Sequence, residues 1–200
     1  MFSLIKKYLD FTLSLLIVVC LSPVLLLLCI LIKMDSPGPI LFKQKRIGKE
    51  KKKFNILKFR TMKINTPNDT PTHLLEKPDF YITRTGKFLR KTSLDELPQL
   101  VNILKGEMSI IGPRPALWNQ YDLIAEREKY KANDILPGLT GLAQISGRDE
   151  LAVEVKAKID GEYVEKMSPL LDSKIFFKTV FSVLKSDGVK EGTNFINKNS

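Results

Sequence analysis

Hydrophobic residues are distributed unevenly along this chain, and its most apolar stretch lies near the start. Phe11–Ile32 reads FTLSLLIVVCLSPVLLLLCILI and carries no charge. At about 1.5 Å per residue, a helix of this length spans a bilayer, and no small-residue cleavage site of a signal peptide follows it. Ser22-Pro23 lies at its centre, where proline removes a backbone donor and bends a helix. The serine hydroxyl can bond a carbonyl that this break leaves without a partner.

Basic residues flank this segment on both sides. Lys6 and Lys7 precede it, and Lys33 and the cluster Lys43–Lys53 follow it. The positive-inside bias draws both flanks to the cytoplasm. A helix broken at Ser22-Pro23 that enters and leaves on one face satisfies both, whereas a straight span places Lys6 and Lys7 outside. The residues alone leave both topologies open, and in either one the part after residue 35 is cytoplasmic.

The rest of the chain alternates short apolar runs with polar turns, which is typical of a small α+β domain. Periodicity predicts a hairpin from Ile40–Phe42 and Phe54–Phe59 around a turn at Gly48, a strand at Met108–Ile111, polar loops over Ile64–Phe80 and Pro137–Gly147, and helices over Thr92–Leu104, Leu117–Lys131, Leu151–Met167 and Leu171–Lys185. The last helix is rich in phenylalanine and lysine. It fits either packing on the core or lying in the membrane interface. We expect two parts, a membrane helix over 1–35 and a membrane-associated catalytic domain over 36–200.

Charge and composition narrow the function. The formal net charge is +10, yet residues 34–63 hold ten bases against Asp35 and Glu50, while residues 64–200 are balanced. Bases beside an apolar segment indicate anionic lipid headgroups rather than nucleic acid. With one histidine (His73, in a predicted loop) and two cysteines inside the apolar run, the chain cannot build a zinc cluster. Chemistry must come from carboxylates, lysines, arginines and the backbone.

Ser93-Leu-Asp95-Glu96 is the main candidate for that chemistry. Ser93 and Glu96 fit a capping box at the start of a helix. That structural role leaves Asp95 unexplained. At the second helical position, Asp95 would face the positive end of the helix dipole, which keeps it ionised. Two adjacent carboxylates there can serve as a nucleophile and as a metal or proton partner.

Several basic side chains can bind phosphate near this pair. Gly112-Pro-Arg114-Pro115 fixes an arginine between two prolines, and Pro137–Gly147 leads to Arg148 through glycines that allow close approach to a ligand. Lys58 and Arg60 add two more bases, and arginine forks match phosphate oxygens. No P-loop or dinucleotide fingerprint occurs. Each arginine alone fits a surface role, but together with the carboxylates and the apolar segment they indicate phosphate chemistry at a bilayer surface.

Five segments in this order resemble the bacterial sugar transferase family, the monotopic phosphoglycosyl transferases that initiate glycan assembly. They are Lys58-Phe-Arg-Thr-Met62, Ser93-Leu-Asp-Glu-Leu-Pro-Gln-Leu100, Gly112-Pro-Arg-Pro115, Pro137-Gly-Leu-Thr-Gly141 and Ser146-Gly-Arg148. The resemblance extends from Lys6 to the region of Asp172. It implies a re-entrant helix broken at Ser22-Pro23, amphipathic surface helices, a small mixed α/β core, and a location on the cytoplasmic face of the bacterial cell membrane.

The resemblance also implies a reaction and a set of roles. The reaction transfers sugar-1-phosphate from a UDP-sugar to undecaprenyl phosphate and releases UMP. Asp95 would be the nucleophile and a ligand of Mg²⁺, and Glu96 would support it. Lys58, Arg114 and Arg148 match positions that hold phosphate, and Asp172 matches a carboxylate near the site. A homodimer is left open.

The donor sugar is less constrained. The stretch from Lys63 through Tyr81–Gly86 to Tyr121 is similar to staphylococcal capsule transferases that use UDP-N-acetylfucosamine. It suggests an N-acetylated hexosamine, 6-deoxy or not, with diacetylated bacillosamine and N-acetylquinovosamine as rivals and Ile64–Phe80 as the candidate selector. UDP-glucose or UDP-galactose is an alternative donor. A non-catalytic module that binds phospholipid headgroups is the alternative from another class.

Overall fold

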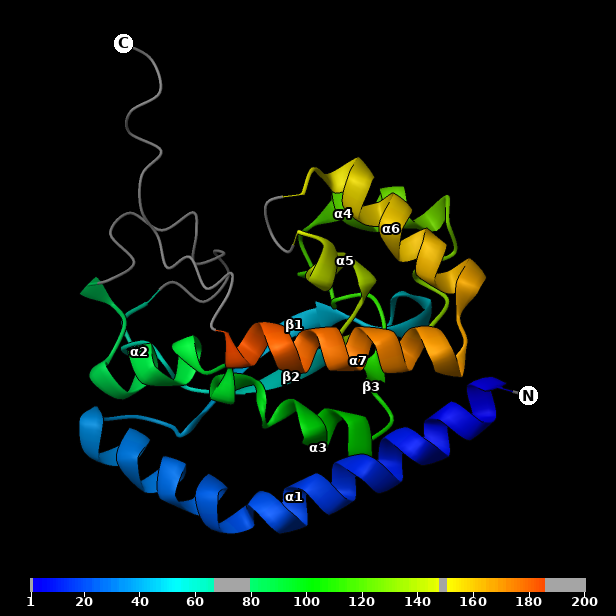
Figure 1. Cartoon of the computed structure of the whole chain (residues 1–200). Helices are drawn as coiled ribbons and strands as arrows, with labels where there is room; N and C mark the ends of the chain where they lie inside the picture. Colours follow the sequence, from blue (N-terminus) through cyan, green and yellow to red (C-terminus); the bar gives the residue numbers. More distant parts are fainter. Residues whose placement is uncertain (1, 67–79, 148–150, 186–200) are drawn as a thin grey trace.

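The first element is one long helix, α1 (Phe2–Asp35), with Pro23 inside it. In this computed structural model, which describes residues 2–66, 80–147 and 151–185, α1 bends near its middle into a shallow V (Figure 1). The Ser22 hydroxyl donates to the Val19 carbonyl over 2.8 Å, so it takes up an acceptor near the break, as the sequence predicted.

Most of α1 is exposed. Of the helices in the described part of the chain, it alone is long and apolar enough to cross a membrane, and 11% of its most apolar 18-residue window is buried. A core helix of a soluble protein would be mostly covered, whereas α1 leaves side chains such as Leu16, Val19 and Leu26 in the open. An exposed apolar surface of this extent is typical of contact with lipid.

Both ends of α1 are bonded to the remainder of the chain. Near its start, Lys6 Nζ donates to Asp172 Oδ2 over 2.7 Å. Near its end, Asp35 Oδ2 accepts the Thr85 amide over 2.9 Å, and Arg60 Nη2 donates to the Ser36 carbonyl over 2.6 Å. These contacts fix the two arms of the V to one folded body.

The predicted hairpin is confirmed. Strands β1 (Leu41–Ile47) and β2 (Lys53–Phe59) pair antiparallel, with Leu41 opposite Phe59 and Ile47 opposite Lys53. The short helix η1 (Lys49–Lys51) connects them. Ile56 and Phe59 turn into two hydrophobic clusters, one around the centre of the fold and one against the second arm of α1. The hairpin therefore packs on both clusters.

The second sheet is a pair of short parallel strands, β3 (Ser109–Ile111) and β4 (Gly138–Thr140). The predicted strand at Met108–Ile111 is thus present. The predicted loop at Pro137–Gly147 is wrong in part, because it holds β4 and the short helix α5 (Leu142–Ser146). A three-residue strand without alternation carries no period-2 signal, so the pattern gave no sign of it.

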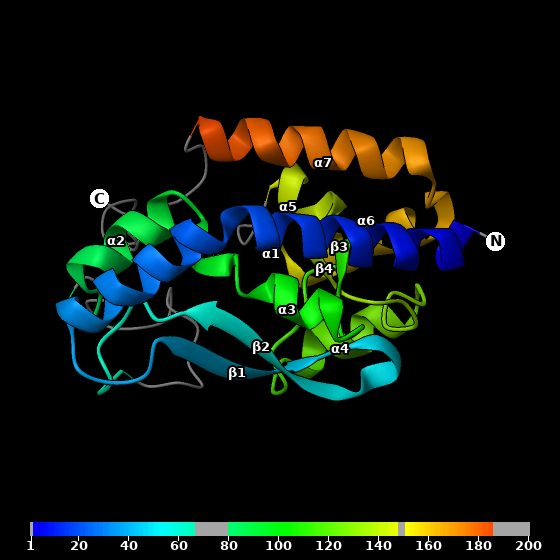
Figure 2. The same cartoon turned by 90° about the horizontal axis from the view of Figure 1, so that it is seen from below.

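The remaining helices surround these sheets. They are α2 (Arg84–Lys91), α3 (Gln99–Leu104), α4 (Tyr121–Glu128), α6 (Val153–Lys166) and α7 (Pro169–Leu184). The helices predicted over 151–167 and 171–185 are confirmed nearly to the residue, and the one over 117–131 is shorter at both ends. Helix α2 was not predicted. The mixture of helix and strand agrees with the expected α+β class, and in Figure 2 the hairpin and α7 lie on opposite sides of α1.

The helix predicted over Thr92–Leu104 is confirmed only in its second half. The 3₁₀ turn η4 (Leu94–Glu96) and then α3 take its place. Ser93 adopts a left-handed conformation with φ of 56°, which ends the preceding helix α2. Pro98 comes directly before α3, a place where its missing N–H costs nothing. The break places Asp95 and Glu96 in a tight turn.

Candidate active site

The carboxylate pair lies in the η4 turn, which begins with a strained residue. The predicted capping box is wrong, because the Ser93 side chain makes no cap hydrogen bond. A left-handed non-glycine residue costs about 1 kcal/mol or more, and such strain is found most often at functional sites. The expectation that Asp95 occupies the second position of an α-helix is also wrong. Its orientation comes from the turn and its neighbours, not from a helix dipole.

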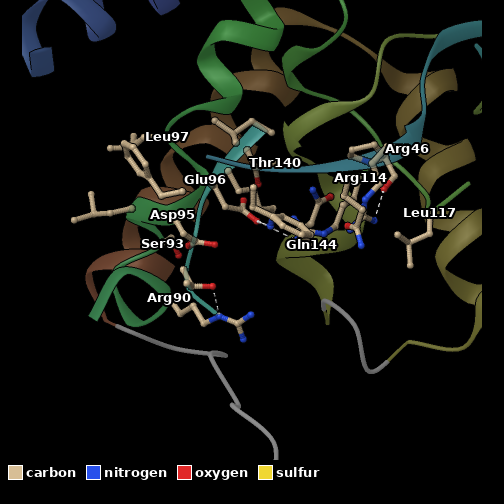
Figure 3. Close-up of a pocket in the computed structure, with 18 of the residues that line it drawn as sticks. Arg46, Arg90, Ser93, Asp95, Glu96, Leu97, Arg114, Leu117, Thr140 and Gln144 are labelled. Atoms are coloured by element: carbon tan, nitrogen blue, oxygen red, sulfur yellow. Dashed lines mark hydrogen bonds and ion pairs between the residues drawn. The ribbon is translucent and has the colours of Figure 1, made fainter. Parts of the chain in front are cut away.

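Glu96 is held by two cations from distant parts of the chain. Its Oε1 accepts from Lys58 Nζ over 2.6 Å and from Arg114 Nη2 over 3.0 Å, as Figure 3 shows for Arg114. Burial alone would raise the pKa of Glu96, but these two charges and their hydrogen bonds outweigh it and hold that pKa far below its usual range. Glu96 is therefore an ionised anchor for both cations.

Asp95 has a different environment. No hydrogen-bond donor of the described residues contacts its carboxylate, although the side chain lines the same cavity. Burial raises the pKa of Asp95, and the negative charge of Glu96 adds to that effect, while Lys58, Arg90 and Arg114 oppose it. The two carboxylates are thus divided in role. Glu96 accepts from two cations through Oε1, and Asp95 is available to a ligand.

The carboxylates border a cavity of about 1050 Å³. Its polar walls include Arg46, Lys58, Arg90, Ser93, Asp95, Glu96, Arg114, Thr140, Gln144 and Lys156, several of which are drawn in Figure 3. A volume of this size accommodates a nucleotide-sized ligand. Cations gathered beside two carboxylates suit a ligand with several negative charges, since arginine and lysine neutralise phosphate oxygens.

Arg114 is fixed in place by a close crossing of two backbone segments. Gly112 N–H donates to the Thr140 carbonyl and Gly138 N–H donates to the Pro113 carbonyl, each over 2.9 Å. A Cβ at Gly138 would lie 2.1 Å from Gly112 N, so only glycine permits the crossing. We expected the glycines of Pro137–Gly147 to admit a ligand. The structure shows instead that they admit the backbone that carries Arg114.

A buried ion pair also holds the backbone segment that carries Arg114. Arg127 Nε and Nη2 donate to Asp160 Oδ2 over 2.8 and 2.6 Å, and both side chains are almost fully buried. Arg127 Nη1 also donates to the Arg114 carbonyl over 2.9 Å. Helices α4 and α6 are therefore joined to the backbone that presents Arg114. The arginine is held from its side chain by Glu96 and from its main chain by Arg127.

Two of the residues proposed from the sequence are bonded to α1. Arg60 borders the cavity, but its guanidinium is buried and donates through Nη2 to carbonyls at the end of α1, including Ile32 over 3.2 Å. Asp172 accepts from Lys6 and, over 2.8 Å, from the Tyr163 hydroxyl, away from the cavity walls. Arg148 lies outside the described residues, as do His73 and most of the proposed selector Ile64–Phe80. Of the proposed set, the structure gathers Lys58, Arg60, Asp95, Glu96 and Arg114 around the cavity.

Arg90 is a candidate that the sequence reasoning missed. It lies in the last turn of α2 and lines the cavity, and its Nε donates to Thr61 Oγ1 over 2.9 Å. Its positive charge acts on Asp95. The signal available was its place five residues before Asp95. The helix that carries Arg90 is not among those predicted from the sequence.

An exposed apolar helix bonded to a small α/β body, with a carboxylate pair and cations around one cavity, is the arrangement expected of a membrane-associated enzyme whose substrates carry phosphate groups. A sequence model of the bacterial sugar transferase family matches residues 1–186. The chain belongs to this family, which confirms the expected resemblance.

Three relatives illustrate the family. The sugar transferase EpsL of Bacillus subtilis is 39% identical over 96% of this chain and 93% of its own length. The UDP-glucose:undecaprenyl-phosphate glucose-1-phosphate transferase of Escherichia coli is 40% identical over 89% of this chain. The UDP-N-acetylgalactosamine-undecaprenyl-phosphate N-acetylgalactosaminephosphotransferase of Aeromonas hydrophila is 35% identical over 94% of it. The matched regions are 40% and 46% of the last two relatives, so the chain spans less than half of their length.

Proposed function

We propose that this protein transfers sugar-1-phosphate from a UDP-sugar to undecaprenyl phosphate and releases UMP, through a covalent intermediate on Asp95. The observation that carries the proposal is the division of the carboxylate pair, with Glu96 bonded to Lys58 and Arg114 and Asp95 unbonded in a cation-lined cavity. The relatives with specified reactions act on undecaprenyl phosphate, which agrees with it.

The first step joins a carboxylate oxygen of Asp95 to the phosphorus that carries the sugar. The bond from that phosphorus to the bridging oxygen of the diphosphate breaks, and this oxygen leaves with its electron pair as part of UMP. The diphosphate repels an incoming carboxylate, and Lys58, Arg90 and Arg114 offset that repulsion. Glu96 is a positioning residue because it holds two of these cations by direct hydrogen bonds.

The second step releases the intermediate to the lipid. A phosphate oxygen of undecaprenyl phosphate attacks the same phosphorus, and the bond to Asp95 breaks. The products are the undecaprenyl-diphosphate sugar and a free Asp95 carboxylate. Two steps let two negatively charged substrates use one pocket in turn, so they are never present together.

We propose Mg²⁺ as the cofactor, with Asp95 as its protein ligand. The described residues contain no cluster of three or more ligating side chains. This fits Mg²⁺, which takes one or two carboxylates and completes its shell with water and substrate phosphate. When bound, the ion neutralises part of the diphosphate charge. Asp95 has the unbonded carboxylate that such a ligand requires.

For the donor, we propose a UDP-linked N-acetylated hexosamine such as UDP-N-acetylfucosamine, on the similarity around Tyr81–Gly86 and Arg114–Tyr121. The relative that uses UDP-glucose keeps a hexose donor as the alternative, whereas the donor of the Aeromonas hydrophila relative is itself an N-acetylated hexosamine. The decisive experiment supplies the purified protein with undecaprenyl phosphate, Mg²⁺ and a panel of UDP-sugars, and measures UMP. Release with one donor, lost on chelation, is expected. A folded, lipid-bound protein that releases none would indicate a headgroup-binding module.

We propose further that α1 is re-entrant and that the protein is monotopic on the cytoplasmic face. The support is that Lys6 and Asp35, at opposite ends of α1, are bonded to the same folded body. A straight span would place these ends on opposite sides of the membrane.

Labelling can test this topology. In a variant with Cys20 and Cys29 replaced by serine, Ser3→Cys is expected to react with a membrane-impermeant maleimide only after the cells are permeabilised. A periplasmic cysteine on a known membrane protein serves as the positive control. Labelling of Ser3→Cys in intact cells would favour a straight span instead.

The pH dependence of UMP release should depend on Lys58. Asp95 must be ionised to attack, so the rate falls as the pH drops through its pKa, which burial raises and the Lys58 charge lowers. Lys58→Met removes the lowering charge and also frees the charge of Glu96. The acid limb of kcat/KM for the UDP-sugar is therefore expected to move to higher pH.

The matched control for this shift is Lys129→Met, since Lys129 pairs with Glu126 on the exposed surface. Its acid limb should coincide with that of the unmodified protein. An unshifted limb in Lys58→Met would mean that the titrating group is not Asp95.

A further inference from the structure

The cavity that holds the carboxylates also has an apolar wall. Phe176, Val180 and Val183 of α7 line it, together with Leu94 and Leu97 of the η4 region. Val180 is 39% exposed, so the cavity reaches the molecular surface beside α7. The phosphates and sugar hydroxyls of a UDP-sugar are polar, so an aliphatic wall of this extent suits a further, apolar ligand group.

Helix α7 has two apolar faces, one for each of the two roles that its sequence left open. Ile175 is fully buried in the core, whereas Phe177 and Phe181 are 60% and 63% exposed. The exposed lysines Lys174 and Lys178 accompany them. The helix therefore packs on the core and presents an outer surface typical of a membrane interface.

The η4 side of this apolar region is in contact with the long apolar helix α1. Leu94 and Leu97 pack against a cluster that contains Leu28 and Ile32 of α1. An apolar path thus runs from the lipid-facing helices to the turn that carries Asp95.

We propose that the isoprenoid chain of the acceptor enters the site between α7 and the η4 turn, with its first units against Val180 and Val183. This inference rests on the proposed function. The acceptor is amphiphilic, and its phosphate must reach Asp95 while its chain stays out of water. The wall at α7 meets both demands, since each buried methylene favours binding and the cations line the same cavity.

The two half-reactions can be measured separately, which distinguishes an effect on acceptor binding from an effect on the first chemical step. Without acceptor, one equivalent of UMP per enzyme reports the first step, and steady turnover with acceptor reports both. Val180→Asp is expected to raise the KM for undecaprenyl phosphate tenfold or more, with the loss confined to the acceptor step. Val180→Leu, which keeps the wall apolar, should retain a KM within threefold of the unmodified protein.

Phe177→Asp is the matched control, because Phe177 lies on the same helix, is exposed and does not line the cavity. Pelleting with vesicles and thermal melting establish that each variant is membrane-bound and folded. Equal increases in acceptor KM for Val180→Asp and Phe177→Asp would overturn the path, because α7 would then act only in membrane docking.

An unchanged acceptor KM in Val180→Asp, in a protein that releases UMP normally, would also overturn the path and leave the proposed function intact. Failure of the unmodified protein to release UMP with any donor is a different result. It would reject the proposed function, and the inference with it.

Discussion

Replacing Asp95 by asparagine is expected to lower the turnover of UMP by at least about 10⁴-fold. The amide has nearly the shape of the carboxylate but cannot attack phosphorus. Glu96 cannot substitute for it, because its carboxylate is bonded to Lys58 and Arg114 and is the weaker base of the two. The reaction should therefore stop at the first step.

The same variant should fold at least as well as the unmodified protein. A carboxylate whose pKa is raised in the folded state binds its proton more tightly there than in the unfolded chain. Its ionised form therefore destabilises the folded state at neutral pH, and stability falls as the pH rises through that pKa. The neutral amide of Asp95→Asn removes this cost, so the melting temperature should be equal or higher.

Three measurements together check the Asp95 prediction. They are UMP release, thermal melting in detergent, and the intact mass after incubation with UDP-sugar alone, which should rise by one phosphosugar only when Asp95 is present. Asp134→Asn, at an exposed position, serves as the matched control and should behave like the unmodified protein. Turnover of Asp95→Asn at the unmodified rate would show that the nucleophile lies elsewhere.

Gly138→Ala is expected to destabilise the protein by about 4 kcal/mol or more, which corresponds to roughly 10 °C in melting temperature. A Cβ at this position would lie 2.1 Å from Gly112 N and 2.4 Å from the Thr140 carbonyl oxygen. Both are backbone atoms, which cannot rotate away as a side chain would. The parallel strands β3 and β4 would have to separate, and the loop that presents Arg114 would lose its support.

Gly106→Ala provides the contrast. Gly106 has a positive φ of 75°, but nothing lies within 4 Å of an added Cβ. Only backbone strain of about 1 kcal/mol is expected there, or a few degrees in melting temperature. Thermal melting of both variants in one detergent measures the difference. Equal shifts for Gly106→Ala and Gly138→Ala would contradict the close crossing of the two backbones.

The parts of the fold that follow from local periodicity could be predicted from the sequence. The membrane helix, the hairpin and the two last helices have strong patterns of apolar residues, and all of them are present. The turn at Ser93 could not be predicted in this way. Its left-handed backbone competes with a good helical pattern, and it is accompanied by an ion pair between Glu96 and Lys58, 38 residues apart.

Residue types identified the site better than they identified its geometry. The motifs pointed to Asp95, Glu96, Lys58 and Arg114, which meet at one cavity. Arg60 also borders this cavity, but its Nη2 bonds to the end of α1, and Asp172, from an equally suggestive motif, bonds to Lys6 near the start of α1. A charged residue that positions a helix and one that faces a cavity have the same sequence signature, and only the tertiary contacts separate them.

The attachment of both arms of α1 to one body has a consequence for how the protein enters a bilayer. With α1 re-entrant as proposed, no charged segment has to cross the hydrocarbon layer, and Lys6 and Asp35 stay where water and their partners reach them. The inserted V adds area to one leaflet only. A high density of the protein should therefore expand that leaflet relative to the other. As the amount of protein per lipid increases, the membrane of reconstituted vesicles should become convex on the side that carries the protein.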